Sequence, residues 1–307
     1  PMAVPSPRGA SRVQAIRTAT AFDVGKLVFV GALWGLSFIL MSLALDSFGP
    51  VSIAAWRIAL AALMLLVICL ATGRKLPGDR EDWGKMLVIG ALNSALPFFL
   101  ISWGLQFVSS AESALLLATG TFCSLILSHF ITTDERINRA RAIGVFLGFC
   151  GVAMLVLDDL VDRGFGGIRG QLAVMGAGIS YAVSSVMSRR ISHLPSLPAA
   201  TGILATGTCY MLPLAFWLEQ PLNAEAGTTA LLALFALGVF ATGLAYVIRL
   251  NIIRYNGAVF MSQVGYLVPL FGVFWAWLLL SEAISLRTLL ALGAICLGIV
   301  ITRRGTR

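Results

Sequence analysis

The sequence carries TTDERINRARAIGVFLGFCGVAM at residues 132–154 and, 147 positions later, LLSEAISLRTLLALGAICLGIVI at residues 279–301. In both stretches a glutamate precedes an apolar segment that contains glycines. The same offset aligns Trp34 with Tyr181, and it holds at both ends of each half without a gap. The chain is therefore predicted to consist of two repeats.

Composition places these repeats in a membrane. Hydrophobic residues make up 58% of the 307 residues, charged residues make up 12%, and the mean hydropathy is +0.91. Charge this scarce excludes a water-soluble globule of this length. An apolar run of about 20 residues crosses the hydrocarbon core, and such runs must be helical because the sequence lacks the alternation of a barrel. Ten spans are predicted, at residues 25–45, 51–71, 85–106, 111–131, 140–157, 168–188, 199–218, 228–250, 257–280 and 286–302.

The direction of the repeats follows from the number of spans. Each repeat has five, an odd number, so the second repeat starts on the opposite side of the membrane, as in many transporters. Lys and Arg gather in alternate loops, for example Arg74 and Lys75 after the second span, whereas loops such as those with Asp46 and Glu219 are acidic. Because positive loops stay cytoplasmic, we predict a multi-pass protein of the bacterial inner membrane with both termini in the cytoplasm.

The predicted organisation has five parts. The N-terminus is rich in Pro, Ser and Arg, which is typical of disorder, and it has no cleavable apolar signal segment. Pro1 ahead of Met2 is interpreted as the remnant of a cleaved tag. The parts are a disordered cytoplasmic N-terminus at 1–23, a first repeat at 24–158, an acidic external linker at 159–167, a second repeat at 168–302 and a basic cytoplasmic tail at 303–307.

Several functional classes find no support in the sequence. All five cysteines fall inside apolar spans without CxxC spacing, so they are interpreted as small residues of the helix contacts. No metal-ligand spacing, phosphate-binding loop or nucleophile–base motif is present. We expect no cofactor, no metal and no enzymatic activity, and the position of the basic residues in loops argues against nucleic acid as a partner.

Each repeat resembles an EamA unit of the drug/metabolite transporter superfamily. The resemblance is carried by the aromatic opening spans, ALWGLSF at 32–38 and GISYAVSS at 178–185, and by the glutamate-to-glycine stretches quoted above. It implies ten helices around a central cavity lined by spans 1, 3, 4, 6, 8 and 9, with spans 5 and 10 at the back. Among members, the chain is most similar to bacterial exporters of amino acids, notably aromatic ones.

Glycines support a close contact of spans 5 and 10, independently of the resemblance. Gly144, Gly148 and Gly151 follow small-xxx-small spacing, and Gly293 and Gly298 do so more loosely. Such spacing lets two helices approach closely in lipid.

Polar and aromatic side chains within the spans mark the candidate binding site, because polar groups are costly in lipid unless they face protein or water. Asn93 and Gln263 are the strongest candidates, since a carboxamide requires several partners at once; bonding between helices is the alternative role. Serine and threonine hydroxyls can instead satisfy a carbonyl of their own helix. The predicted substrate-binding residues are Trp34, Ser37, Phe38, Asn93, Thr119, Tyr181, Ser184, Ser185, Tyr246, Gln263 and Tyr266.

Charged residues near the span ends receive structural interpretations. Arg57 is predicted to pair with Asp46 or Glu112. The alternatives are that it snorkels outward or that it attracts a substrate carboxylate to the outer mouth. Glu135 and Glu282 occupy equivalent positions in the repeats and are predicted to pin the turns after spans 4 and 9.

No Asp or Glu lies in the middle third of any predicted span, so a built-in proton relay is not supported. The sequence as a whole predicts an exporter of small metabolites, most favourably amino acids including aromatic ones, that works by alternating access of the two repeats. The expected partners are this small-molecule substrate and the lipid bilayer. Export of another metabolite or drug-like compound is the first alternative and an intramembrane enzyme the second. Oligomeric state and coupling ion stay open.

Overall fold

The structure is a computed structural model that describes residues 18–131 and 137–304, and within these ranges every regular element is a helix. The α-helices are α1 (Ala21–Leu45), α2 (Pro50–Ala71), α3 (Arg80–Gly90), α4 (Leu96–Gly104), α5 (Ser110–Leu116), α6 (Thr119–Ile131), α7 (Arg139–Gly167), α8 (Arg169–Ser188), α9 (Ser196–Leu218), α10 (Thr228–Ala236), α11 (Ala245–Asn256), α12 (Ala258–Met261), α13 (Val264–Leu280) and α14 (Leu286–Arg304). Two π-helical stretches, η1 (Ala91–Ala95) and η4 (Leu237–Leu244), and two 3₁₀ turns, η2 (Arg189–Ile191) and η3 (Pro221–Asn223), complete the set.

The ten predicted spans correspond to these helices. In the described residues, nine helical stretches are long and apolar enough to cross a membrane, and Leu286–Thr302 is a shorter apolar helix. One span joins α3, η1 and α4 into Arg80–Gly104, and another joins α10, η4 and α11 into Thr228–Asn256. The predicted fold class, an all-α protein with many membrane spans, is confirmed.

The main boundary differences have local causes. Helix α1 begins at Ala21 because the hydroxyl of Thr20 accepts from the N–H of Asp23 while the Asp23 carboxylate accepts from the N–H of Thr20. This capping box extends the helix into the segment predicted to be disordered. The segment predicted as an external linker, residues 159–167, continues α7, and a non-helical residue, Gly164 with φ of 62°, interrupts it.

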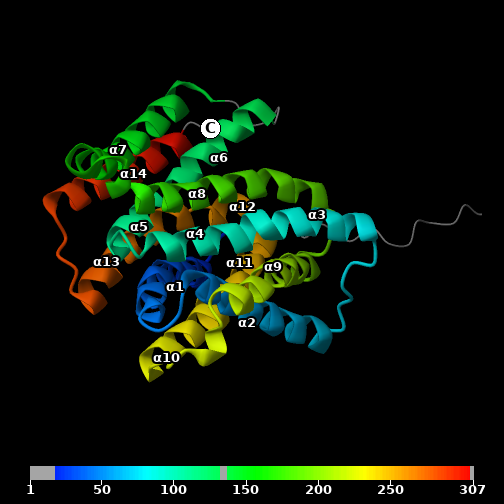
Figure 1. The fold of residues 1–307 in the computed structure, drawn as a ribbon. Helices are drawn as coiled ribbons and strands as arrows, with labels where there is room; N and C mark the ends of the chain where they lie inside the picture. The colour runs from blue at the N-terminus through cyan, green and yellow to red at the C-terminus, as the bar shows by residue number, and fades with distance from the viewer. Residues whose placement is uncertain (1–17, 132–136, 305–307) are drawn as a thin grey trace, which may run out of the picture.

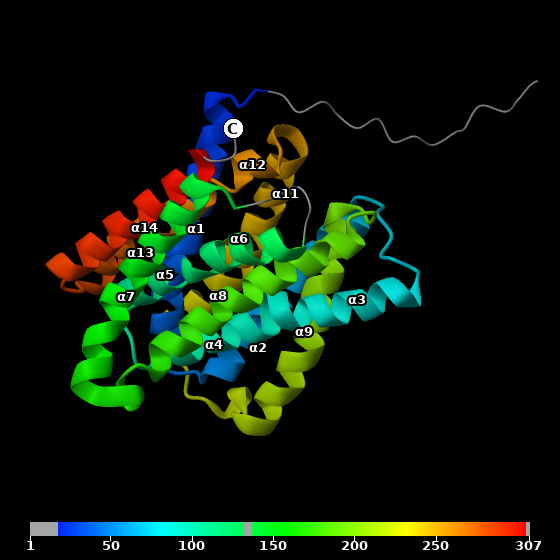
Figure 2. The same cartoon turned by 90° about the horizontal axis from the view of Figure 1, so that it is seen from above.

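Helices that occupy equivalent places in the two repeats lie side by side. Helix α7 lies along α14 at one edge of the bundle, and α2 lies along α9 (Figures 1 and 2). Between α7 and α14, a methyl group added at Gly144 would lie 2.5 Å from the carbonyl oxygen of Gly298. Gly293, in contrast, has no neighbouring atom within 4 Å of such a methyl group. The glycine-based contact between spans 5 and 10 is present, without Gly293.

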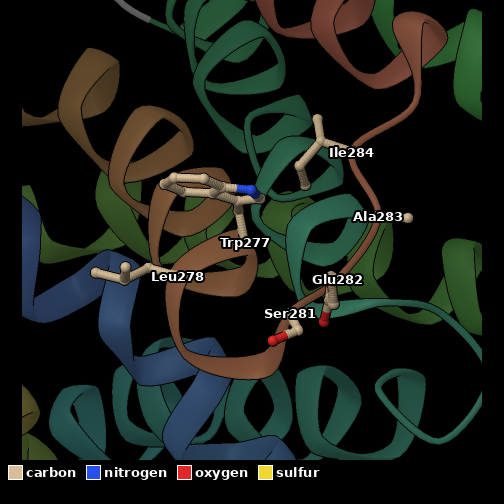
Figure 3. Close-up of a pocket in the computed structure, with 6 residues that line it drawn as sticks. All are labelled: Trp277, Leu278, Ser281, Glu282, Ala283 and Ile284. Atoms are coloured by element: carbon tan, nitrogen blue, oxygen red, sulfur yellow. The ribbon is translucent and has the colours of Figure 1, made fainter.

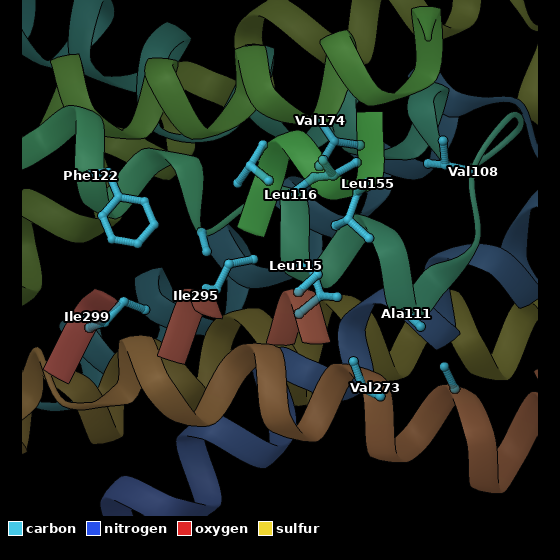
Figure 4. Packing of buried hydrophobic residues seen from close by; sticks show 14 of the residues in the cluster. Val108, Ala111, Leu115, Leu116, Phe122, Leu155, Val174, Val273, Ile295 and Ile299 are labelled. Atoms are coloured by element: carbon cyan, nitrogen blue, oxygen red, sulfur yellow. The ribbon is translucent and has the colours of Figure 1, made fainter. Parts of the chain in front are cut away.

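The hydrophobic cluster behind α5 and α6 fixes this edge to the rest of the bundle. Figure 4 shows Phe122 of α6 directed towards Ile295 and Ile299 of α14, with Leu115 and Val273 further along the same cluster. All five side chains are buried. The cluster therefore joins helices of both repeats and holds α5 and α6 in place beside α8.

The two π-helical stretches occupy equivalent positions, since the 147-residue offset places Ala91–Ala95 within the range of η4. Each contacts a helix of the other repeat. A methyl group at Gly238 of η4 would lie 2.5 Å from Cβ of Leu60 on α2, and one at Gly90, just before η1, would lie 2.7 Å from the carbonyl oxygen of Ile203 on α9. Such π turns frequently mark functional sites, and here both lie near the middle of their spans.

Candidate functional site

A hydrogen-bonded cluster of polar side chains lies where η1 meets the second repeat. The side-chain amide of Asn93 donates to Oγ of Ser184 on α8 at 3.0 Å. The hydroxyl of Tyr246 on α11 donates to Oδ1 of Asn93 at 2.8 Å. One donor and one acceptor of the carboxamide thus bind two different helices, and the cluster contains residues of both repeats.

Helix α8 contributes two serine hydroxyls to this cluster. Oγ of Ser184 donates to the carbonyl oxygen of Tyr181 at 2.9 Å, and Oγ of Ser180 donates to the carbonyl oxygen of Leu92 at 2.7 Å. In the first repeat, Oγ of Ser37 donates to the carbonyl oxygen of Trp34 at 2.6 Å, which is the equivalent of the Ser184 bond. Ser37 therefore satisfies its own helix, whereas Ser184 has a further partner in Asn93.

Arg57 extends the cluster towards α2 and η4. Its Nε donates to Oγ1 of Thr242 at 2.8 Å, and its guanidinium carbon lies 3.9 Å from the ring centroid of Phe98. Phe98 in turn meets Tyr181 edge-to-face, with centroids 6.4 Å apart. The predicted pair of Arg57 with Asp46 or Glu112 is wrong. Among the described residues, no carboxylate lies in ion-pair distance of Arg57, and Glu112 accepts from Gln171.

The structure brings four of the predicted residues together, namely Asn93, Tyr181, Ser184 and Tyr246. The other seven lie outside this polar group, although Phe38 belongs to a hydrophobic cluster on which Tyr181 packs. Phe38 and Ser37 are buried in the helix contacts, and Trp34 packs on residues of α11 to α13. Thr119 is buried, and its hydroxyl has no hydrogen-bond partner among the described residues. The hydroxyl of Tyr266 donates to the carbonyl oxygen of Ile299 at 3.3 Å, whereas Ser185 and Gln263 are exposed.

Arg57, Thr242 and Phe98 belong to the same cluster although the sequence did not assign them to the site. Thr242 lies in η4, where its hydroxyl donates to the carbonyl oxygen of Leu237, five residues earlier, at 2.9 Å. The signal available in the sequence was the charge of Arg57 inside an apolar span, for which substrate attraction was the alternative interpretation.

Carboxylates join the repeats at both ends of the bundle. At the far face, where α1 ends, Glu219 accepts from the N–H groups of Val51 and Ser52 at 3.0 and 2.7 Å. Glu282 accepts from those of Ser110 and Ala111 at 3.0 and 3.1 Å. Glu282 thus caps the N-terminus of α5 in the first repeat, whereas it was predicted to pin the turn that follows its own span. Its predicted counterpart, Glu135, lies outside the described residues.

At the N-terminal face, where α1 begins, two further polar contacts cross between the repeats. Nδ2 of Asn256 donates to Oδ2 of Asp23 at 3.2 Å, and Nε2 of His193 lies 3.2 Å from the carboxylate oxygens of Asp82. Both ends of the bundle are therefore tied across the repeat interface.

Two recesses lie away from the polar cluster. One, of about 620 Å³, is lined by Trp277, Leu278 and the turn from Ser281 to Ile284 (Figure 3). Its carboxylate, Glu282, is already engaged by α5. The other, of about 460 Å³, is lined mainly by apolar side chains of α2 and α10, including Trp56 and Phe235. Neither recess contains a residue of the Asn93 cluster.

A bundle of membrane-spanning helices in two repeats, with a half-buried polar cluster to which both repeats contribute, is the architecture of a membrane transporter. The chain belongs to the EamA-like transporter family, which matches residues 25–157 and 168–304. It is a transporter and not an enzyme.

Relatives agree with this assignment, and a solved structure agrees with the fold. The chain is 23% identical to the uncharacterized transporter YoaV of Bacillus subtilis, over 89% of this chain and 94% of that protein. It is 26% identical to the uncharacterized inner membrane transporter YedA of Escherichia coli K12, over 92% and 90%. A crystal structure with 18% sequence identity covers 94% of this chain and 100% of its own with a TM-score of 0.69, which supports the fold.

Proposed function

We propose that this transporter exports small metabolites, with amino acids including aromatic ones as the favoured class, across a bacterial inner membrane. The two repeats rock against each other, so that a central site opens to one side of the membrane at a time. Both termini lie in the cytoplasm, as the distribution of positive loops predicts.

The observation that carries the proposal is the cluster of Asn93, Ser184 and Tyr246. A site used in alternating access must be formed by both repeats, since their relative movement has to open and close it. Asn93 belongs to the first repeat, Ser184 and Tyr246 belong to the second, and their two hydrogen bonds cross the interface. A solute with polar groups can replace these bonds one for one.

The rings around the cluster support a substrate with an aromatic or apolar part. Tyr181 and Phe98 form an edge-to-face pair beside the polar side chains, and Tyr246 supplies a third ring. Ligand sites typically combine such apolar walls with a few fixed polar groups. Of the other predicted binding residues, Trp34 lies near the middle of α1 and packs on the hydrophobic cluster that includes Ala245.

The charges near the cluster disfavour the alternative of a cationic drug. Recognition of a cation in a dehydrated site calls for a carboxylate or an open aromatic face. Among the described residues, no carboxylate joins the cluster, and the face of Phe98 is already covered by Arg57.

Flux of radiolabelled phenylalanine and tryptophan into proteoliposomes tests the proposal. We expect saturable flux above that of empty vesicles and a strong loss in Asn93→Ala. The matched control is Asn251→Ala. Asn251 is exposed, and its one hydrogen bond among the described residues is to the carbonyl oxygen of Val247 on its own helix. Absence of saturable flux for both amino acids contradicts the amino-acid assignment.

A further inference from the structure

Arg57 is a buried cation that has no counter-ion among the described residues. Its side chain lies in the span Pro50–Ala71, and the residue is 4% exposed. Among the described residues its partners are a hydroxyl, a thioether and an aromatic ring, all of them neutral. A charge held in this way is unfavourable unless something supplies an opposite charge.

The guanidinium group has donors to spare. Nε is bound to Thr242, while Nη1 faces Sδ of Met41 at 3.4 Å, and a thioether is only a weak acceptor. Nη2 has no hydrogen bond with any described residue. The edge of the planar group formed by Nη1 and Nη2 therefore retains the two adjacent N–H donors that bind a carboxylate in a bidentate manner. Met41 is unbranched and adaptable, so it can yield its place to a ligand.

The fold does not require this charge. The residue equivalent to Arg57 in the second repeat is Leu204, which is fully buried in α9. The same place in the same five-helix unit is thus filled by an apolar side chain. The two repeats also differ at the partner position, where Thr242 corresponds to Ala95. At this place the two repeats therefore differ by one charged group and by the hydroxyl that orients it.

We propose that Arg57 binds the carboxylate of the transported solute, with Thr242 orienting the guanidinium group. This inference rests on the proposed function, since it takes the Asn93 cluster as the remainder of the same site. Arg57 is connected to that cluster because Phe98 touches both the guanidinium group and the ring of Tyr181.

A second arginine, Arg249, lies next to the cluster at Tyr246. The guanidinium carbon of Arg249 lies 5.6 Å from the ring centroid of Tyr246, and among the described residues no carboxylate is in ion-pair distance of it. The charged groups around Tyr246 are therefore both positive. An ammonium group of the solute would meet only neutral oxygens such as Oδ1 of Asn93, so the carboxylate is the group that the site selects.

Matched acid and amide ligands test whether Arg57 binds the carboxylate of the solute. Purified wild-type protein is titrated with L-phenylalanine against L-phenylalaninamide, and with 3-phenylpropionate against 3-phenylpropionamide, while the shift in thermal unfolding is recorded. We expect the acid of at least one pair to bind about tenfold or more tightly than its amide, as charge-assisted hydrogen bonds imply. Arg57→Leu, the residue of the other repeat, and Arg57→Gln should both abolish this preference, and Arg57→Lys should retain part of it.

The outcomes separate carboxylate binding by Arg57 from the proposed function. Carboxylate binding by Arg57 is contradicted if acid and amide bind wild type equally, if no acid binds, or if Arg57→Gln keeps the preference for the acid. If Arg57 had a purely structural role, its substitution would lower the affinity for acid and amide alike. That result would also contradict carboxylate binding by Arg57. Flux of labelled phenylalanine reports on the amino-acid assignment independently. Intact flux in Arg57→Gln contradicts carboxylate binding by Arg57 but leaves the amino-acid assignment in place. A preference for 3-phenylpropionate over its amide, without flux of phenylalanine, contradicts the amino-acid assignment but leaves carboxylate binding by Arg57 in place.

Discussion

The hydroxyl of Tyr246 and the amide oxygen of Asn93 are 2.8 Å apart, and the hydrogen bond between them joins the second repeat to the first near the middle of the membrane spans. The equivalent of Tyr246 in the first repeat is Phe99, which has no hydroxyl. The bond thus has no counterpart by symmetry, and it belongs to the cluster and not to the repeated frame.

Removing this hydroxyl should weaken both stability and transport. In Tyr246→Phe, Oδ1 of Asn93 loses its donor at a half-buried position, which is expected to cost about 0.5–1.5 kcal/mol. We expect a lower thermal unfolding midpoint and a several-fold loss of phenylalanine flux in proteoliposomes. Tyr210→Phe is the control, because Tyr210 is exposed and its hydroxyl has no hydrogen bond with the described residues. Equal phenylalanine flux in Tyr246→Phe and Tyr210→Phe would show that the Tyr246 hydroxyl is not part of the substrate-binding site.

The carboxylate of Glu219 should hold the start of α2 in place. It accepts two backbone N–H groups that the helix cannot satisfy by itself, and its charge opposes the positive end of the helix dipole. Glu219→Ala is expected to destabilise the protein by about 1–2 kcal/mol. Hydrogen exchange should accelerate at residues 51–53, measured by mass spectrometry of the corresponding peptide.

Glu225→Gln is the matched control for this change, since Glu225 lies exposed in the loop that follows Glu219. It should leave both the stability and the exchange at residues 51–53 as in wild type. Unchanged exchange in Glu219→Ala would show that the N–H groups of α2 find other acceptors and that Glu219 does not tie the repeats at this face.

The architecture could be predicted from the sequence because its causes are local and repeated. Apolar length identifies the spans, and glycine spacing identifies the contact between α7 and α14. Asn93 was predictable as well, since a carboxamide in the middle of a span must find partners somewhere.

The partners themselves depend on geometry that hydropathy does not encode. The π turn at η4 changes the register of that span, and Thr242 faces Arg57 from within this turn. The pairing of Arg57 with acids at the span ends was predicted from depth alone and failed for this reason. Gln263 lies at the break between α12 and α13, where the span is not a continuous helix, and this break leaves it exposed.

The proposed orientation of the chain can be tested at two loops. Gly78 lies before α3 at the N-terminal face and Gly227 lies before α10 at the far face, and at neither does an added side chain meet an atom within 4 Å. In a background without the five native cysteines, Gly227→Cys should react with a membrane-impermeant maleimide in intact cells. Gly78→Cys should react only after permeabilisation. The reverse pattern would place the termini outside the cytoplasm.

The contact between α7 and α14 should be intolerant of a side chain at Gly144 and tolerant of one at Gly293. At Gly144 an added methyl group would meet the carbonyl oxygen of Gly298 at 2.5 Å and the backbone nitrogen of Thr302 at 2.7 Å. Backbone atoms cannot rotate away as a flexible side chain can, so the helices must separate and lose the contacts of the cluster around Ile295 and Ile299.

Gly144→Val is therefore expected to cost about 1–3 kcal/mol or more, seen as a lower midpoint of thermal unfolding in detergent. Gly293→Val on the opposite helix places its Cβ where no atom lies within 4 Å, and it should leave the midpoint nearly unchanged. Because both substitutions add the same side chain to a helix of the same pair, the difference between the two midpoints isolates the contact from helix propensity. Equal midpoints would mean that α7 and α14 can separate without cost, and these helices would then not form a fixed edge of the transporter.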